Sequence, residues 1–159
     1  MTHEKDLYFI KLAIDAARNG VVQNEGGPFG TVIVKEDAIV GMGNNRVVST
    51  NDPTAHAEVV AIREACENLK SFQLTGCTIY TSCEPCPMCL GAIYWARPDR
   101  IVYACSREDA AAIDFDDDFI YKEIKLPMQE RKIPTEQCGR QLGLEVFRFW
   151  VNKEDKVRY

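Results

Sequence analysis

The sequence predicts an α/β protein that forms one domain around a mixed β-sheet, with helices packed on the faces of the sheet. Its length of 159 residues is enough for one hydrophobic core, and 46% apolar with 27% charged residues is ordinary for a globular protein. Strand and helix patterns alternate along the chain after an initial hairpin, without a linker or an internal repeat. Such an order implies a mixed sheet, with right-handed crossovers between parallel neighbours.

The first part of the chain predicts a helix and then a β-hairpin. Gly20 is placed to end this helix, whose apolar residues recur at helical spacing, namely Leu7, Ile10, Ile14 and Ala17. The glycine-rich segment 26–30 then breaks the chain before the β-branched run Thr31–Val34. A tight turn near residues 35–37 leads back through a second strand at residues 39–42.

A further helix is predicted to begin at Asp52 and Pro53. Asp52 offers a capping side chain directly before a proline at the first helical position. This start would place His56 and Glu58 near the N-terminal turns of the helix.

The next strand, residues 77–82, leads into another helix. The spacing of Cys86 and Cys89 puts both sulfurs on one face of its first turn. This helix must stop around Pro98, and residues 101–104 form the last predicted strand. Both helices then start at the carboxyl ends of strands, where α/β sheets commonly bind ligands.

His56, Cys86 and Cys89 are ligand types that zinc prefers, and three protein ligands leave a fourth coordination position open for a water. The positive helix N-termini favour thiolate over thiol, and zinc can lower the pKa of its bound water to about 7. Glu58 is placed to take the proton that this water releases. The pattern H-x-E followed by P-C-x-x-C is the signature of zinc nucleobase deaminases, with the Glu as general acid and base. The sequence therefore predicts a catalytic zinc site.

Two other interpretations of these cysteines remain open. A structural zinc site normally has four protein ligands, and Cys83 is the nearby candidate for the fourth. That arrangement would leave Glu58 without a purpose. The second alternative is a redox Cys-x-x-Cys pair, although no thioredoxin-like sequence surrounds it.

Charge and cysteine usage limit the partners of the protein. The formal net charge of −5 argues against nucleic acid, because phosphate binding depends on clustered Lys and Arg. No run approaches the roughly 18 apolar residues of a membrane span, and the N-terminus lacks the order of a signal peptide. Seven cysteines, two of them assigned to metal, disfavour a secreted disulfide framework. We expect a small-molecule substrate and a cytoplasmic location, with neither nucleic acid nor membrane as partner.

Three further stretches are candidates for function. Asn44 and Asn45 follow the second strand, where short amides can face a pocket or merely form a turn. The acidic stretch 114–118 contains two aromatic residues and forms either a solvated loop or one with a single Asp turned inward. Residues 144–151 are apolar enough for a terminal helix, and residues 153–159 form a mostly charged tail that ends on an aromatic residue.

Together these motifs resemble the bacterial guanine deaminases of the cytidine-deaminase-like superfamily. The resemblance covers the whole chain and is carried by Gly27–Gly30, Asn51–Glu58, Thr81–Pro98, Phe115–Asp117 and the C-terminal Tyr159. The zinc motifs indicate the superfamily. The stretch after Cys105 and the tail indicate guanine as the substrate.

The resemblance implies a three-layer α/β/α fold, a homodimer and hydrolysis of guanine to xanthine and ammonia. It implies that His56, Cys86 and Cys89 bind one zinc ion per subunit and that Glu58 shuttles protons. It also implies that the tail, about residues 144–159, closes the active site, either of its own chain or swapped across the dimer.

The resemblance implies pocket residues as well. Phe29 and Asn45 would line the purine pocket, Asp117 would contact the purine and assist proton transfer, and Tyr159 would close the site. The stretch after Asn45 is one residue longer than expected, so Asn44 stays an alternative to Asn45.

The implied reaction is attack of a zinc-bound hydroxide on C2 of guanine while Glu58 delivers the proton to a ring nitrogen, followed by loss of the amine. A deaminase of guanosine or of another amino-substituted ring would use the same catalytic residues in a different pocket. A tRNA adenosine deaminase shares the Asn51–Glu58 type of motif, but would need a basic C-terminal helix with aromatic platforms. A zinc-stabilised scaffold protein would have lost Glu58.

Overall fold

The computed structural model describes residues 3–115 and 117–159. The chain forms two compact units, residues 1–117 and 118–159, and each is described by itself. The elements of the first unit are α1 (His3–Val22), β1 (Gly30–Lys35), β2 (Ala38–Asn44), α2 (Val47–Thr50), α3 (Ala57–Leu69), β3 (Cys77–Cys83), α4 (Pro87–Ala96), β4 (Arg100–Cys105) and α5 (Arg107–Ala111). Those of the second unit are α6 (Asp118–Lys125), the 3₁₀ helix η1 (Met128–Glu130) and α7 (Arg140–Asn152).

The four strands form one mixed sheet in the order β2-β1-β3-β4. Strand β1 pairs antiparallel with β2 and β3, whereas β3 and β4 are parallel. Glu36 and Asp37 both have positive φ, as the tight turn of a two-residue hairpin requires. The predicted hairpin and mixed sheet are therefore confirmed.

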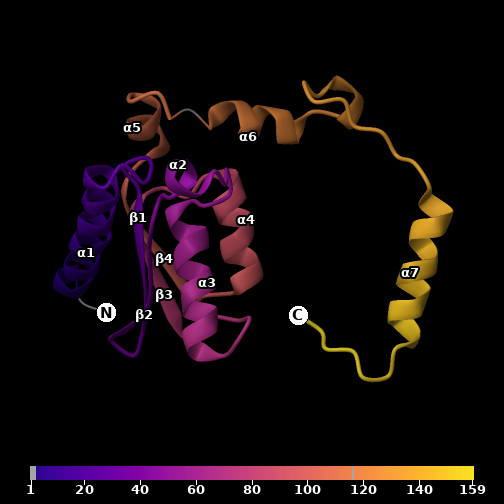
Figure 1. Ribbon diagram of the computed structural model, residues 1–159, viewed down its shortest axis with the longest axis horizontal. Coiled ribbons are helices and arrows are strands. Elements are labelled where there is room, and N and C mark those ends of the chain that lie inside the picture. Colours follow the sequence, from indigo (N-terminus) through magenta and orange to yellow (C-terminus); the bar gives the residue numbers. More distant parts are fainter. Residues whose placement is uncertain (1–2, 116) are drawn as a thin grey trace. The chain divides into compact units, whose positions relative to one another are not determined.

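Successive side chains of β1 and β3 point to opposite faces of the sheet and build two separate cores. Val32, Val34 and Tyr80 pack with Phe9, Ile10 and Ala13 of α1. Ile33, Cys77 and Ile79 pack on the other face with residues of α3 and α4, namely Ala61, Ala65, Ile93 and Ala96. Figure 1 shows α1 on one side of the strands and α3 and α4 on the other. The predicted three-layer α/β/α arrangement is confirmed.

Glycines let the helices lie directly on the strands. A Cβ on Gly30 would come within 2.2 Å of the Ala13 carbonyl oxygen, and one on Gly43 within 2.5 Å of the Ala57 carbonyl oxygen. No side chain fits either gap. The contact at Gly43 brings the first turn of α3, which carries the predicted catalytic residues, against the end of β2.

This close packing explains why the predicted apolar face of α1 was partly wrong. Leu7 and Ile14 are 45% and 38% exposed. The buried side instead uses mostly small residues, namely Phe9, Ile10, Ala13, Ala16, Ala17 and Gly20. Because the helix backbone lies directly against β1, small side chains face the sheet, and the helix continues past Gly20 to Val22.

The predicted start of the helix after Asp52 was also wrong, since α3 begins at Ala57. Oδ1 of Asp52 accepts hydrogen bonds from the backbone N–H and the hydroxyl of Thr54, at 2.8 and 2.7 Å. The side chain therefore stabilises a turn with a residue two positions on, and does not cap a helix.

A polar cluster ties α1 to two strands. Arg100 donates two hydrogen bonds of 2.8 Å to the carboxylate of Asp6, and the hydroxyl of Tyr80 donates a third at 2.9 Å. The hydrogen bonds from Arg100 hold the pKa of Asp6 below its usual value. Burial, and then the Asp6 hydrogen bond, raise the pKa of Tyr80 to about 12. The cluster thus fixes the helix on the sheet by a bidentate charged contact.

In the second unit, α7 begins at Arg140, earlier than the predicted residue 144. Several large apolar side chains of this helix are exposed in the single chain, including Leu142, Val146, Phe147 and Phe149. Within the described part of the chain, no helix combines the length and the apolar character needed to cross a membrane.

Candidate active site

The predicted zinc ligands lie where two helices begin. His56 is the N-cap residue of α3, and Cys86 is the N-cap residue of α4. Both have extended backbone angles, which turn the chain into its helix at that residue. Pro87 follows at the first helical position of α4, where its missing N–H costs nothing, and Cys89 lies in the same turn.

The structure brings the side chains of His56, Cys86 and Cys89 together. Nδ1 of His56 lies 3.6 Å from Sγ of Cys86 and 3.4 Å from Sγ of Cys89, and the three ligand atoms all lie within 4.8 Å of one another. A tetrahedral zinc ion with ordinary Zn–N and Zn–S bonds separates its nitrogen and sulfur ligands by about 3.6 Å. The group therefore fits zinc.

Cys83, the alternative fourth ligand, makes a different contact. Its thiol donates to the carbonyl oxygen of Ser106 at 3.5 Å, and burial raises its pKa to about 11. Among the described residues, the group that could hold a metal consists of His56, Cys86 and Cys89. This count leaves a coordination position for a water, as catalytic zinc sites require.

The pKa values of the two thiols, Cys86 and Cys89, shift in opposite directions. The contact with Cys89, with a further hydrogen bond from His56, lowers the pKa of Cys86 to about 4. The same contact with Cys86, and burial, raise the pKa of Cys89. The hydrogen bond to Cys86 also raises the pKa of His56. The lowered pKa favours the thiolate of Cys86, which is the form that binds metal.

Glu58 lies beside this group in the first turn of α3 and is only 6% exposed. Its Oε2 accepts a hydrogen bond of 3.3 Å from the Cys89 thiol. Burial raises the pKa of Glu58, although the Cys89 contact opposes part of that rise. A buried carboxyl with a raised pKa next to a metal group is suited to accept and release protons.

Asn45 is buried in the turn that follows β2. Its Oδ1 accepts hydrogen bonds of 3.2 Å from the backbone N–H groups of Gly27 and Val47. The backbone N–H of Asn45 donates to the carbonyl oxygen of Phe29 at 3.0 Å. Because two backbone N–H groups already donate to the amide oxygen, a ligand would meet Asn45 through its side-chain NH₂ group, which donates.

Asn44 has a different set of contacts. Its Nδ2 donates to the carboxylate of Glu25 at 2.5 Å and to the carbonyl oxygen of Asn45 at 3.2 Å. Both donors of its amide are therefore used within the protein.

The acidic stretch reaches this region through an aromatic contact. Phe115 packs edge-to-face on Phe29, with ring centroids 4.9 Å apart and an interplanar angle of 87°. The negative charge of Asp117 contributes, after Cys86 and Glu58, to the raised pKa of His56. Asp118 begins α6 and forms an ion pair of 2.5 Å with Lys122. Asp116, within the predicted motif, lies outside the described residues.

The structure does not bring every predicted residue to one place. Tyr159 belongs to the second compact unit, so its role in closing the site stays a prediction. Sequence reasoning missed the contact of Phe115 with Phe29. The signal for it was the pair of aromatic residues in the acidic stretch, but their partner lies far away in the sequence.

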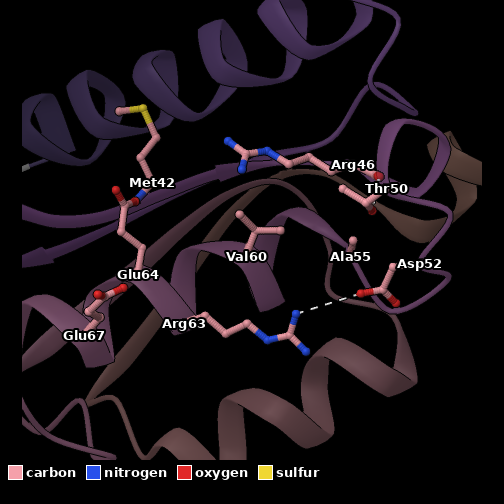
Figure 2. A pocket seen from close by; sticks show the side chains of 9 residues that line it. All are labelled: Met42, Arg46, Thr50, Asp52, Ala55, Val60, Arg63, Glu64 and Glu67. Carbon is pink, nitrogen blue, oxygen red and sulfur yellow. Dashed lines mark hydrogen bonds and ion pairs between the residues drawn. The ribbon is translucent and has the colours of Figure 1, made fainter.

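A charged surface hollow of about 380 Å³ lies near the site (Figure 2). Arg46 and Ala55, which directly follow Asn45 and precede His56, both line it. They are joined by a hydrogen bond of 2.9 Å from the Arg46 N–H to the Ala55 carbonyl oxygen. Asp52 and Arg63 face each other in the hollow at 3.9 Å. The hydrogen bond between Arg46 and Ala55 therefore closes the loop of residues 46–55, which connects Asn45 to His56.

Zinc-dependent nucleobase deaminases use three His and Cys ligands and a separate glutamate as general acid and base. The N-termini of α3 and α4 bring together such a set here, on an α/β/α fold. A family model for the cytidine and deoxycytidylate deaminase zinc-binding region matches residues 3–105, so the chain belongs to this zinc-binding deaminase family.

Comparison with individual relatives extends the match beyond that region. The chain is 54% identical over 159 residues to guanine deaminase from Bacillus subtilis (strain 168), covering 100% of both chains. The X-ray structure of guanine deaminase from Bacillus subtilis superposes with a TM-score of 0.95 over 100% of this chain and 99% of that one. A tRNA-specific adenosine deaminase from Buchnera aphidicola is 36% identical, with 84% of each chain covered. The resemblance to bacterial guanine deaminases is confirmed.

Proposed function

We propose that this protein is a zinc-dependent guanine deaminase, which converts guanine and water to xanthine and ammonia. The observation that carries the proposal is the His56, Cys86 and Cys89 group with Glu58 beside it. It occurs in a chain whose similarity to guanine deaminase also covers residues 106–159, beyond the zinc-binding region.

His56, Cys86 and Cys89 hold one zinc ion per subunit. When bound, the ion supplies an activated water at the open coordination position. The thiolate of Cys86 and the helix N-termini supply an environment that favours a cation held by anionic sulfur.

Glu58 moves the protons of the reaction. It takes a proton from the attacking water and delivers it to a ring nitrogen next to C2 of guanine. It then takes the proton of the hydroxyl now bonded to C2 and delivers it to the amine, which leaves as ammonia while the C2 carbonyl of xanthine forms. A buried carboxyl with a raised pKa holds each proton during its transfer more readily than an exposed one would.

The pocket residues orient the purine. Asn45 offers its NH₂ group to an acceptor atom of the ring, because its amide oxygen is occupied by Gly27 and Val47. Phe29 provides an apolar wall. Asp117 accepts hydrogen bonds from purine N–H groups and assists proton transfer. Tyr159 covers the ligand at the end of the tail.

The active protein is a homodimer of a single deaminase domain, residues 1–159, in which the C-terminal segment of about residues 144–159 closes an active site. The exposed apolar side chains of α7 support this proposal, because a helix with such a surface is stable in water when another surface covers it. A second copy of the chain is the proposed cover, and the tail is exchanged between the two copies.

The substrate is a free purine base in the cytoplasm. All seven cysteines are free thiols in the structure, as a reducing compartment favours. The net charge of −5 opposes binding to a phosphate backbone, so a tRNA is not the substrate.

The decisive experiment combines metal analysis with ammonia release from guanine, guanosine, adenine, cytosine and cytidine. We expect one zinc per chain and turnover of guanine well above the other four compounds. Equal or faster turnover of guanosine would assign the nucleoside as substrate, and turnover of adenine, cytosine or cytidine without turnover of guanine would overturn the proposal.

A further inference from the structure

Phe115 connects the acidic stretch to the turn that holds Asn45. Its ring packs edge-to-face on Phe29 at a centroid distance of 4.9 Å. The carbonyl oxygen of Phe29 accepts the N–H of Asn45, and the N–H of Gly27 donates to the side chain of Asn45. Phe115 therefore contacts the same backbone turn that fixes the amide in the proposed purine pocket.

Gly27 provides the space that this ring occupies. A Cβ at Gly27 would lie 2.9 Å from Cζ of Phe115 and 3.1 Å from Cε2 of Phe29. The backbone of Gly27 is not in the left-handed region, so glycine is needed here for space and not for its backbone angles. Gly27, Phe29 and Phe115 thus form a fitted contact, which we call the aromatic clasp.

Asp117 follows Phe115 by two residues in the chain. The stretch from Asp114 to Asp117 lies between α5 and α6. The Phe115 ring connects this stretch to Phe29 through a side-chain contact.

We propose that Phe115 is a positioning residue, which holds Asp117 in place for the purine by packing on Gly27 and Phe29. This inference rests on the proposed function, because that function assigns Asp117 its contact with the substrate. Loss of one edge-to-face aromatic contact allows the loop to leave its productive position. The expected cost is about three- to tenfold in kcat/KM.

The first test compares Phe115→Ala, Phe115→Tyr, Asp117→Asn and the double variant Phe115→Ala/Asp117→Asn with guanine as substrate. Phe115→Ala should lower kcat/KM about three- to tenfold at unchanged zinc content, and Phe115→Tyr should restore it because the ring is kept. The double variant should be no worse than Asp117→Asn alone, since Phe115 acts through that carboxylate. Tyr8→Ala is the matched control, because it removes an edge-to-face contact with Phe9 on α1 and should leave kcat/KM unchanged.

The second test changes Gly27, the residue of the clasp that gives space to the Phe115 ring. Gly27→Ala pushes a methyl group into the Phe115 ring and should cause a loss of similar size. In the Phe115→Ala background this methyl group still meets the Phe29 ring but no longer meets the Phe115 ring, so Gly27→Ala should cost less there than in the wild type. Gly91→Ala is the matched glycine control, since nothing lies within 4 Å of its added Cβ.

The outcomes separate this inference from the proposed function. Losses that multiply in the double variant, or an unaffected Phe115→Ala, would overturn the positioning role while guanine turnover by the wild type still supports the proposed function. Full activity in Asp117→Asn would remove the substrate contact itself and the inference with it. A wild-type protein without guanine turnover would instead overturn the proposed function.

Discussion

Glu58 is buried and lies two residues from His56, a proposed zinc ligand, and a substitution can separate its role from metal binding. Glu58→Ala should retain zinc, because Glu58 is not among the three ligand residues. Turnover should fall by about 10²–10⁴-fold or more, the typical worth of a general acid and base. Metal content and guanine turnover, measured on the same preparation, test this. Loss of zinc in proportion to activity would show that Glu58 helps to hold the metal.

The acidic stretch offers a comparison within a few residues. Asp117→Asn should fold and bind zinc yet deaminate poorly, because an amide presents a donor where the purine already has an N–H group. Asp118→Asn and Asp114→Asn should change little. Asp118 pairs with Lys122 in α6, and Asp114 has a φ of 69°, which asparagine tolerates. Three equal activities would return the whole stretch to the solvated-loop interpretation.

At the scale of elements, the cluster of Asp6, Tyr80 and Arg100 predicts a pH-dependent contribution to stability. The pKa of Asp6 is lowered in the folded state, so its contribution is present above the unfolded pKa and is lost as the pH falls through the folded pKa. Asp6→Asn should lower the free energy of unfolding by about 1 kcal/mol at pH 7, a modest value because Arg100 is partly exposed.

Denaturant unfolding at several pH values measures this effect. The gap between wild type and Asp6→Asn should stay constant from about pH 7 to 5 and narrow below about pH 4. Asp37→Asn is the control, because the exposed ion pair of Asp37 with Lys5 should contribute little at any pH. A gap that widens on acidification would contradict the assigned direction.

The elements also show where prediction from sequence succeeded. The strands were predictable because β-branched runs bounded by glycine and turn residues have few alternatives, and the Cys86 helix because Pro87 and Pro98 mark its ends. The start of α3 was not, because a capping residue and a turn residue look alike in sequence. Asp52 hydrogen-bonds Thr54 in a turn, and the helix begins after His56.

The metal ligands of the site were predictable from the sequence, but the contacts around them were not. His56, Cys86 and Cys89 occur in a spacing that only a metal explains well, and the structure does bring them together. The packing of Phe115 on Phe29 was not predictable, since it joins residues that no local pattern relates. Tyr159 belongs to the second compact unit, so its role at the site stays a prediction.

At the scale of the whole molecule, the proposed exchange of tails predicts that two inactive proteins can complement each other. One carries Glu58→Ala with an intact tail, and the other lacks Tyr159. If tails are exchanged, a mixed dimer has one site with both Glu58 and the partner's tail. Random pairing makes half of the dimers mixed, so about one quarter of wild-type activity should return after co-expression.

The controls for this experiment are each variant expressed alone. If each tail closes its own site, no complete site can form and the mixture should stay inactive. Full activity of the form that lacks Tyr159 would show that the tail is not needed to close the site.

The positions of His56 and Cys86 at the starts of α3 and α4 have a mechanical consequence. A bound ion would tie the two helix ends together and close a loop of chain between them, so that fraying of either end must break a metal bond. Amide hydrogen exchange in the first turns of α3 and α4 should therefore slow together on zinc loading and speed up together on chelation, with α1 unaffected. The ion would then act as a reversible cross-link of the fold as well as a Lewis acid.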